Sequence, residues 1–490
     1  MVDFISVPAT NRVPFVFVEV DNSRAESGPK VQDYRIACLG QRRSTGLVAA
    51  NTAFRALSAD QVAEAAGSGS VLHAMALALF RANKVAEAWF VGVADAGGGV
   101  AATKTLTVTG PATENGSLYL YVAGRRIVVP VVSGDSANTV AASINSAIAA
   151  SDFAPELPVT AGVAANVVTL TARNAGTVGN DVDVRLNHAL GEETPAGVTV
   201  VVAAGVAGAT DPSFAAAIAA LGDQQYNALA FGLGDTTTIG LAHAELADRF
   251  GPTRMIPGQA FFGKSDTHAN LLTFASSLNS PHCHLNGWKS PLSPPWEAAT
   301  SLAGVLAREA QRDPARPFTR LELPGVVGPA LADRFTFEER EFLLRGGVAT
   351  LVTDELGVSR VDRPITTYRT NAQGVKDESY LDANTLFTLD FLRYDFRRAF
   401  LSTYPRAKLA DDGTRYGAGQ PVVTPKIVRG FALTRFRAWE ELGLVEGFSQ
   451  FQRDLVVQRS STDRNRLDVL LPADLVNQLL VTGTSIKFLL

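Results

Sequence analysis

The chain has 490 residues, of which 46% are hydrophobic, and its formal net charge is −4. This length predicts about three domains, and the slightly acidic balance argues against a global basic surface for nucleic acid. Two cysteines, Cys38 and Cys283, exclude a disulfide framework, the longest run of low polarity (196–209) is too short to span a bilayer, and the N-terminus lacks the features of a signal peptide, so we expect a soluble cytoplasmic product.

The first predicted element is a strand near the N-terminus, with the sequence RVPFVFVEV at 12–20. Its apolar side chains are Val13, Phe15, Val16, Phe17, Val18 and Val20. The polar segment 21–30 that follows is typical of a tether. A strand this apolar needs partners for its edges and its faces, and those partners need not come from the same chain.

From residue 34 onward, short apolar runs alternate with amphipathic stretches. The predicted strands are 34–40, 86–94, 226–233, 258–264 and 282–288, and the predicted helices are 70–84, 211–224, 236–250, 265–279 and 293–311. Ser293 is the expected N-cap of the last helix, with prolines in its first turn. Strands that alternate with helices in this way predict a layered α/β middle domain, made of residues 25–95 and 210–334.

The alternation is interrupted at 96–209, which begins with a flexible Gly-rich link, DAGGGVAA. Period-two patterns predict strands at 104–110, 117–132, 166–186 and 197–205. One amphipathic helix is predicted at 134–151, with Val140, Ile144 and Ile148 four residues apart. Five basic and eight acidic residues give the segment a net charge of −3. We expect an inserted β-rich domain, and we expect the α/β domain to fold when 97–208 are replaced by a short linker.

A third, α+β domain is expected at 335–480. Its predicted elements are a helix at 336–347, a hairpin at 348–370, and helices at 382–404 and 426–443. Residues 390–440 carry ten basic and five acidic side chains, a net charge of +5 in a chain that is negative overall. Arg393 and Arg397 fall four residues apart on one predicted helix, with Arg398 alongside. They form either a solvated helix face or a surface that docks onto an acidic partner.

The chain ends in an apolar sequence, SIKFLL at 485–490. Free termini are usually polar and frayed, and Ile486, Phe488, Leu489 and Leu490 would be an aggregation hazard in water. Both ends of the chain therefore look like strands that must be covered. Two possibilities stay open, burial in the chain's own sheet and strand addition to a neighbour's sheet.

No segment combines the residues that catalysis or metal binding requires. His282 and His284 lie two apart on a predicted strand, but no further Cys/His cluster completes a metal site. The sequence GLGDTTTIG at 232–240 lacks the Lys-Ser/Thr pair of a phosphate loop, so Asp235 or a threonine is expected to cap a helix there.

Two polar segments allow a plain and a functional interpretation. Asp354, Glu355 and Asp362 form either an acid pair or, as we favour, a solvated hairpin turn. The sequence NAGTVGND at 174–181 predicts a tight loop that needs positive φ, with a carbohydrate or ion loop as the alternative.

Several of these segments, taken in order, resemble the tail sheath proteins of contractile bacteriophages, particularly the Mu-like group. They are RVPFVFVEVDNSRA at the start, ARNAGTVGNDVDV in the insertion, SPLSPPWEAATSLAGVLA in the middle domain, and ITTYRTNAQGVKDESYLDANTLFTLDFLRYDFRRAF near the C-terminus. The resemblance covers essentially the whole chain. Each motif alone is modest, and the specificity comes from their order and from the interrupted middle domain.

The resemblance implies a structural protein, with no catalytic residues, no metal and no other cofactor. Sheath subunits of this family stack as hexameric rings around a tube and contract to drive the tube through a bacterial envelope. On this pattern, 1–24 and 481–490 are arms that add strands to sheets of neighbouring subunits. The C-terminal domain faces the tube, which makes Arg393, Arg397 and Arg398 candidates for tube contact, and the insertion faces outward.

The implied partners are further copies of the chain, the tail tube protein, and baseplate and tail terminator proteins, with no direct nucleic-acid contact and no membrane insertion. The product is expected in the virion tail, after assembly in the cytoplasm of the bacterial host. A phage-tail-like bacteriocin or a secretion system would use a related sheath. Two other classes stay open: an α/β enzyme, marked by a deep pocket with perturbed titrating groups, and an adhesin-like module, marked by surface aromatics on the insertion.

Overall fold

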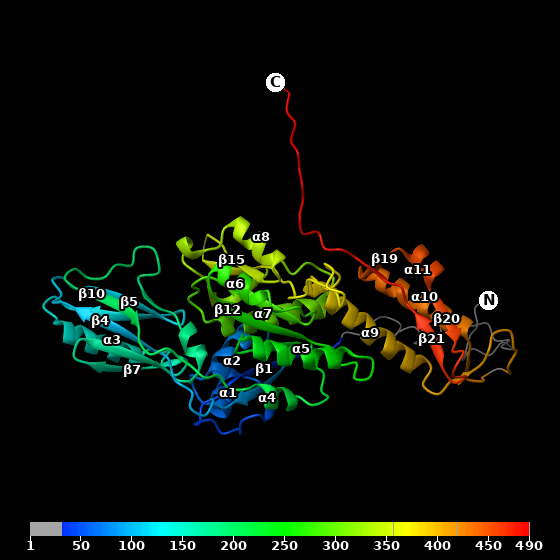
Figure 1. The fold of residues 1–490 in the computed structure, drawn as a ribbon, viewed down its shortest axis with the longest axis horizontal. Coiled ribbons are helices and arrows are strands. Elements are labelled where there is room, and N and C mark those ends of the chain that lie inside the picture. Colours follow the sequence, from blue (N-terminus) through cyan, green and yellow to red (C-terminus); the bar gives the residue numbers. More distant parts are fainter. Residues whose placement is uncertain (1–31, 356, 418, 490) are drawn as a thin grey trace, which may run out of the picture. The chain divides into compact units, whose positions relative to one another are not determined.

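The computed structural model describes residues 32–355, 357–417 and 419–489 (Figure 1). The described residues form two compact units, one of 33–390 with 477–489 and one of 391–476 with residue 32. They contain eleven α-helices. Among them, no helix combines the length and the apolar character that crossing a membrane requires. The predicted N-terminal arm, 1–24, and Leu490 lie outside the described residues.

A nine-stranded sheet forms the centre of the larger unit, in the order β14-β16-β15-β13-β12-β11-β1-β3-β2. The six strands from β15 to β3 run parallel, and β2, β16 and β14 pair antiparallel at the two ends. The bounds are β1 (Arg35–Gln41), β2 (Ala53–Arg55), β3 (Glu87–Val93), β11 (Ala228–Phe231), β12 (Gln259–Ser265), β13 (Cys283–Trp288), β14 (Glu322–Val327), β15 (Ala349–Thr353) and β16 (Val358–Arg363). Parallel strands are buried on both faces. The continuous apolar runs of this sequence fit such strands, because side chains on both faces then contact the core.

Helices cover the sheet, and most begin where the sequence predicts. They are α1 (Ala59–Ala66), α2 (Val71–Ala82), α4 (Ala215–Ala219), α5 (Thr236–Phe250), α6 (His268–Ala275), α7 (Pro295–Arg312) and α8 (Phe337–Arg345). The side chains of Ser70, Asp235 and Thr336 accept hydrogen bonds from the first turns of α2, α5 and α8. The helix-cap interpretation of Asp235 is therefore confirmed.

Two predicted helix starts are wrong, and in both cases a tertiary contact takes the capping side chain away. Pro294 occupies the N-cap of α7, while the Ser293 hydroxyl accepts a hydrogen bond from the Val327 amide. The helix expected at 211–224 shrinks to α4, because Asp211 instead accepts hydrogen bonds from Thr177 of the insertion.

The insertion consists of two antiparallel sheets that share one helix, α3 (Ala137–Ala150). One sheet has the order β10-β4-β8-β7 and the other β6-β5-β9. Their strands are β4 (Thr103–Thr109), β5 (Gly116–Val122), β6 (Arg125–Val131), β7 (Val159–Ala164), β8 (Val167–Ala172), β9 (Val184–Leu186) and β10 (Thr199–Ala204). The predicted helical stripe of Val140, Ile144 and Ile148 is buried between them.

The loop NAGTVGND joins the insertion to the central sheet at both of its ends. Asn174 donates a hydrogen bond to Asp95, just before the insertion, and the Ala175 amide donates to the same carboxylate. Thr177 bonds to Asp211, just after the insertion. Gly176 has φ 103, and a Cβ there would lie 2.6 Å from the Asp211 carboxylate, so only glycine fits. The segment is thus a structural joint, as the turn interpretation predicts.

A buried ion pair holds the tip of an inserted hairpin against the central domain. Arg125 follows the β5–β6 turn, and its Nη1 lies 2.8 and 2.7 Å from the two carboxylate oxygens of Glu297 in the first turn of α7. Arg125 is 6% exposed and Glu297 1%. Replacing 97–208 with a linker would remove Arg125 from Glu297 and would remove Asn174 from Asp95. The expectation that the core folds without the insertion stays a prediction, and these contacts are the ones that the core would lose.

The division between the two units differs from the expected domain start at 335. The predicted hairpin exists as β15 and β16, but β15 pairs with β13, so the hairpin extends the central sheet. The helix predicted at 382–404 is α9 (Ala383–Thr403). The chain divides within α9, between Asp390 and Phe391.

The smaller unit combines the second half of α9 with α10 (Pro425–Glu441) and α11 (Phe448–Asp454). Its three two-stranded sheets pair β17 (Lys408–Leu409) with β18 (Val422–Val423), β19 (Val445–Glu446) with β22 (Asp474–Leu475), and β20 (Val456–Arg459) with β21 (Leu467–Leu470). Asp395 on α9 is buried and accepts hydrogen bonds from Arg435 and from the Trp439 indole on α10. This contact fixes the two long helices to each other.

Of the two histidines at 282 and 284, His284 lies on β13 and is held by hydrogen bonds within the core. His284 is fully buried, with Nδ1 2.9 Å from the Ile365 carbonyl oxygen and Nε2 2.6 Å from the side-chain oxygen of Gln259. Both ring nitrogens of His284 are therefore engaged by protein atoms. In the described part of the chain, no group of three or more His, Cys, Asp and Glu side chains is placed to hold a metal ion.

Removing the cation of the buried pair should destabilise the larger unit strongly. Arg125→Met is expected to lower the free energy of unfolding by about 3–5 kcal/mol, because it leaves a buried carboxylate uncompensated. Urea denaturation followed by circular dichroism measures this loss. The double variant Arg125→Met with Glu297→Leu should recover most of it.

Arg345→Met is the matched control, because Arg345 forms an exposed ion pair with Glu341 one helical turn away. Such a pair contributes only about 0.3–0.5 kcal/mol. Equal losses for the two arginine variants would show that the hairpin tip does not depend on Glu297.

Acid should weaken the larger unit through two buried histidines. Burial lowers the pKa of His73 to about 4 and that of His284 to about 4, below the ordinary value of about 6.5. Below about pH 6.5 these histidines are protonated in the unfolded chain but stay neutral in the folded chain. The free energy of unfolding therefore falls as the pH drops toward 4, by roughly 3 kcal/mol per histidine. Urea unfolding at a series of pH values measures the slope.

The variant His284→Gln isolates one of these contributions. Its free energy of unfolding should depend less steeply on pH between 6.5 and 4.5 than that of the unaltered chain. An unchanged slope would mean that His284 does not titrate between the folded and unfolded states in this range.

Candidate assembly surfaces

An α/β sheet of this kind has one place where a ligand site is expected, the crevice at its topological switch point. In the strand order, β3 follows on one side of β1, and β12 follows on the opposite side of β11. The topological switch point therefore lies between the neighbouring strands β1 and β11. The carboxyl ends of both strands meet α2 there. A Cβ on Gly40 would lie 2.7 Å from Met75, and one on Gly232 would lie 2.8 Å from Val71. The helix thus packs directly on the strand ends.

The inserted domain fills what remains of this crevice. Asn174 accepts a hydrogen bond from the Val71 amide at the start of α2 and donates to the Arg42 carbonyl. Gln41, the last residue of β1, donates to Asp95. The space left between Val71, Asn174 and Trp296 is about 10 Å³, enough for about one water molecule. Among the described residues, the switch point is thus occupied by a domain joint.

The polar hairpin residues also have structural partners. Asp354 contacts Arg360, and Asp362 contacts Arg340 and Thr350. Each carboxylate therefore has its own cation, and the acid pair considered from the sequence is not formed between Asp354 and Asp362.

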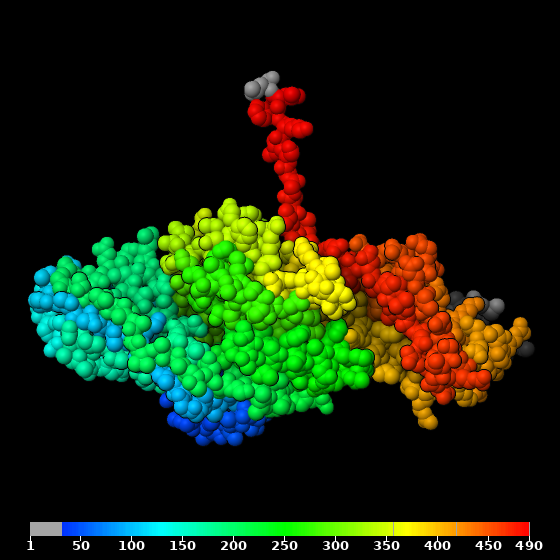
Figure 2. Space-filling model, viewed as in Figure 1, coloured from blue at the N-terminus to red at the C-terminus, as the bar shows by residue number. Residues whose placement is uncertain are grey.

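The C-terminal segment of the described chain leaves several large apolar side chains uncovered. Residues 481–489 have no regular secondary structure, and all nine are exposed (Figure 2). Ile486 is 86% exposed, Phe488 77% and Leu489 100%. Of the two possibilities for this terminus, the described residues show no burial in the chain's own sheet. Leu490 lies outside the described residues.

An open sheet lies in the smaller unit. The strands β20 and β21 pair only with each other among the described strands, in an antiparallel register that matches Val456 to Leu470 and Gln458 to Asp468. Two strands alone are marginally stable in water. The hairpin therefore offers backbone donors and acceptors on two edges to any strand that approaches.

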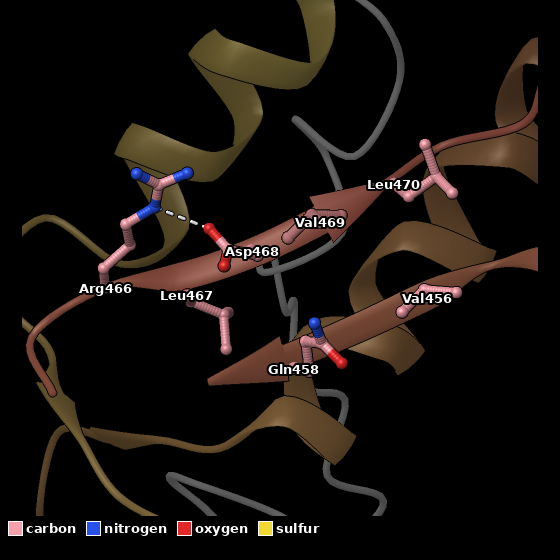
Figure 3. Close-up of a pocket in the computed structure, with 7 residues that line it drawn as sticks. All are labelled: Val456, Gln458, Arg466, Leu467, Asp468, Val469 and Leu470. Carbon is pink, nitrogen blue, oxygen red and sulfur yellow. Dashed lines mark hydrogen bonds and ion pairs between the residues drawn. The ribbon is translucent and has the colours of Figure 1, made fainter. Parts of the chain in front are cut away.

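The two faces of this hairpin differ. Side chains alternate along a strand, so Val457, Leu467 and Val469 share one face, and Val456, Gln458, Asp468 and Leu470 share the other. A groove of about 590 Å³ is lined by seven residues of the hairpin (Figure 3). Arg466 and Asp468 form an ion pair beside it. Its mixed apolar and polar lining is compatible with an amphipathic strand.

The sequence analysis missed this hairpin, although a signal was present. Two short apolar runs, LVV at 455–457 and LDVLL at 467–471, flank the turn-forming sequence SSTDRN at 460–465. This is a hairpin pattern with a longer loop. The extension of the first strand to Arg459 and the register became visible only in the folded chain.

The three candidate arginines on α9 are not equivalent. Arg393 is partly buried and takes part in an interaction of its own. Arg397 is exposed, and Arg398 is exposed and donates a hydrogen bond to the Tyr394 hydroxyl. Among the aromatic residues of the same helix, Phe387 is buried, and Phe391 and Tyr394 are partly covered. The helix thus exposes Arg397 and Arg398, whereas Arg393 is partly buried and already has an interaction partner.

The candidate residues of the N-terminal arm cannot be placed in the same way. Val13, Phe15, Val16, Phe17, Val18 and Val20 all lie outside the described residues. The arm at this end therefore stays a prediction from the sequence.

Comparison with known proteins gives two family matches along the chain. The model of the phage tail sheath protein central domain matches residues 207–367, and the model of the phage tail sheath C-terminal domain matches 375–482. The Mu-like prophage FluMu tail sheath protein of Haemophilus influenzae is 37% identical over 489 residues, which covers 100% of both chains.

Solved structures resemble the chain at much lower identity. The sheath complex of an extracellular contractile injection system in its contracted state has a TM-score of 0.51 at 10% identity, covering 98% of both chains. The sheath tail protein from Desulfitobacterium hafniense has a TM-score of 0.49 at 14% identity, covering 95% of this chain and 97% of that one. At such identities the first of these matches shows a shared fold.

Proposed function

Because this chain belongs to the family of Mu-like contractile tail sheath proteins, which are structural proteins and not enzymes, we propose that it polymerises as stacked hexameric rings around a tail tube. Contraction of this polymer drives the tube through a bacterial envelope. The subunits assemble in the cytoplasm of the host and form the sheath of the virion tail, with the tube, baseplate and tail terminator proteins as partners. The exposed apolar C-terminal segment is the observation that carries the proposal.

The energetics of that segment favour a partner strand. Burying Ile486, Phe488 and Leu489 would contribute about 5–9 kcal/mol at about 1.5–3 kcal/mol each. Ordering six backbone residues costs about 6–12 kcal/mol. Apolar burial alone therefore does not hold the segment in one place. Backbone hydrogen bonds to an open sheet edge add the missing contribution, which is why a strand of another subunit's sheet is the proposed location.

The open hairpin β20–β21 is the acceptor that this proposal assigns. It lacks further strands among the described residues, and strand addition would stabilise a sheet that is marginal with two. We extend the same role to 13–20, whose alternating Phe and Val side chains would cover both faces of an added strand. Each subunit then both gives strands and receives them, so that the polymer is a continuous mesh.

The exposed cations of α9 are assigned to the tube. A single exposed ion pair contributes only about 0–1 kcal/mol, but every subunit along the tube repeats it. Weak repeated contacts suit a sheath that must hold its tube and then release it. A phage-tail-like bacteriocin or a secretion system would need the same contacts, and the Mu-like prophage relative is the reason for naming the phage tail.

Removing either arm should prevent assembly without unfolding the subunit. Deleting 1–20, or introducing Ile486→Asp with Phe488→Asp, is expected to leave a folded protein that forms no cylinders, because the added strands lose their apolar contacts. Negative-stain electron microscopy and sedimentation of the purified protein measure assembly, and circular dichroism measures folding.

Val375→Asp is the control for the C-terminal variant, since Val375 is 61% exposed but lies in a turn outside the arm. It should assemble as the unaltered chain does. Normal cylinders from the arm variants would contradict strand addition by the termini.

Reversing the exposed charges of α9 should separate sheath assembly from tube binding. Arg397→Glu with Arg398→Glu is expected to form cylinders but to lose binding to tube protein in co-sedimentation, because attraction to an acidic surface becomes repulsion. The loss should be largest at low salt, where exposed charges are least screened.

Arg453→Glu with Arg464→Glu provides a matched double charge reversal elsewhere on the same unit, at exposed positions. This control should bind the tube normally. Undiminished binding by the α9 variant at low and moderate salt would return Arg397 and Arg398 to the solvated-face interpretation.

A further inference from the structure

The inserted domain holds one leucine fully in solvent. Leu190 lies at the apex of the loop between β9 and β10, and its side chain is 107% exposed, the highest value among the large hydrophobic residues that the structure describes. A single exposed leucine on a flexible loop is ordinary. The contacts around Leu190, however, fix the loop.

Glu192 ties the loop to the underlying sheet. Its carboxylate is only 5% exposed and lies 2.9 Å from the Tyr121 hydroxyl, 2.5 Å from Nε of Arg126 and 3.0 Å from the Ala189 amide. Burial alone would raise the pKa of Glu192, but the hydrogen bonds from Ala189, Arg126 and Tyr121 lower it on balance. The anchor is thus charged at neutral pH.

A second anchor closes the same loop. The Asn187 side-chain amide donates a hydrogen bond to the Thr194 hydroxyl at 2.9 Å, and the Asn187 backbone amide bonds to the Tyr119 carbonyl. Leu190 is therefore displayed in a preorganised position. An apolar group held this way loses little conformational freedom when a partner covers it.

A cavity that fits such a side chain lies at the end of α7. Its volume is about 170 Å³, which is large enough to admit the four carbon atoms of a leucine side chain. The lining residues are Glu309, Arg312, Asp313, Arg316, Pro317, Phe318, Thr319 and Leu321. Pro317, Phe318 and Leu321 supply apolar surface, and the stems of the two arginines extend it.

Each surface carries one exposed charge that is left for a partner. Glu193 is exposed next to the apex, and Arg316 is exposed at the cavity. The cavity lining also holds Asp313 and an ion pair between Arg312 and Glu309. Neither Glu193 nor Arg316 forms an ion pair within the described part of the chain. A leucine-bearing loop with one unpaired acid and a cavity with one unpaired base therefore occur on separate elements of one unit.

We propose that Leu190 of one copy inserts into the cavity beside Phe318 on a second copy, with Glu193 of the first facing Arg316 of the second. The contact joins two different surfaces, so it is heterologous, and each copy can give one contact and receive another. Repetition produces a ring or a helical polymer. The contact involves neither terminal arm and goes beyond the strand addition proposed above.

Cross-linking of cysteine variants tests the contact. A full-length chain carrying Glu193→Cys and Arg316→Cys is treated with a short bismaleimide, because the Cα atoms of an ion pair lie farther apart than a disulfide spans. Cys38 and Cys283 are buried and should not react in the folded protein. A ladder of dimers, trimers and longer products is expected on a denaturing gel, since each copy carries both reactive positions.

Mixing the two single-cysteine variants gives the matched control. It should yield dimers that contain one copy of each variant and no longer products, because each copy then has one reactive position. Homodimers of Glu193→Cys in equal amount, or the absence of any ladder from the double variant, would overturn the proposal.

Leu190→Ala, added to the double-cysteine chain, tests the leucine itself. Cross-linking is expected to fall about tenfold, the factor for losing most of a buried leucine side chain. The arm variant Ile486→Asp with Phe488→Asp should keep the cross-link, so failure of strand addition and failure of this contact give different results. Unchanged cross-linking by Leu190→Ala would show that the loop does not insert.

Discussion

The hydrogen bonds of Asp95 and Asn174 are the constraint on which the architecture of the larger unit depends. Asp95 follows β3, and Asn174 comes from the middle of the insertion, yet their side chains meet at the carboxyl edge of the central sheet. Asn174 also satisfies the Val71 amide, one of the groups that the start of α2 leaves without a helical partner. The insertion is therefore a third layer of the α/β domain at this edge.

This constraint explains why an α/β sheet can serve as structural material. The switch-point crevice is the usual position of a substrate in such sheets, and here an amide and a carboxylate occupy it. The buried Arg125–Glu297 pair adds a second attachment some distance along the insertion. Two separate attachments resist rotation of the inserted domain far better than a tether would. In the polymer proposed above, this rigidity would help each subunit to transmit force.

Two features of the described residues are left exposed and could bind other molecules. The segment 481–489 exposes apolar side chains, and the hairpin β20–β21 exposes strand edges in the described residues. Exposed apolar side chains and unpaired strand edges are each unfavourable in water. In the proposed strand addition, the segment supplies a strand and the hairpin supplies the edge that the strand pairs with. The fixed Leu190 loop belongs to the same class of feature, because its hydrogen bonds hold an apolar group away from its own domain. Stability within the subunit and incompleteness at its edges together favour assembly.

The sequence by itself determined the elements whose signals are local. Apolar periodicity placed α2, α3, α5 and the parallel strands, and the capping side chains of Ser70, Asp235 and Thr336 set their starts, because these patterns depend on neighbours within one helical turn. The order of motifs also identified the family, while the arms at the two apolar ends stay a prediction. Only the tertiary structure decided the rest. Ser293 and Asp211 form hydrogen bonds with residues distant in sequence and therefore do not cap the helices predicted beside them. The strand β15 pairs with β13 across a long connection. Arg393 is partly buried, while Arg397 and Arg398 are exposed. In the first two cases the interacting residues are far apart along the chain. A local sequence pattern cannot show which distant group will pair with a given donor or acceptor.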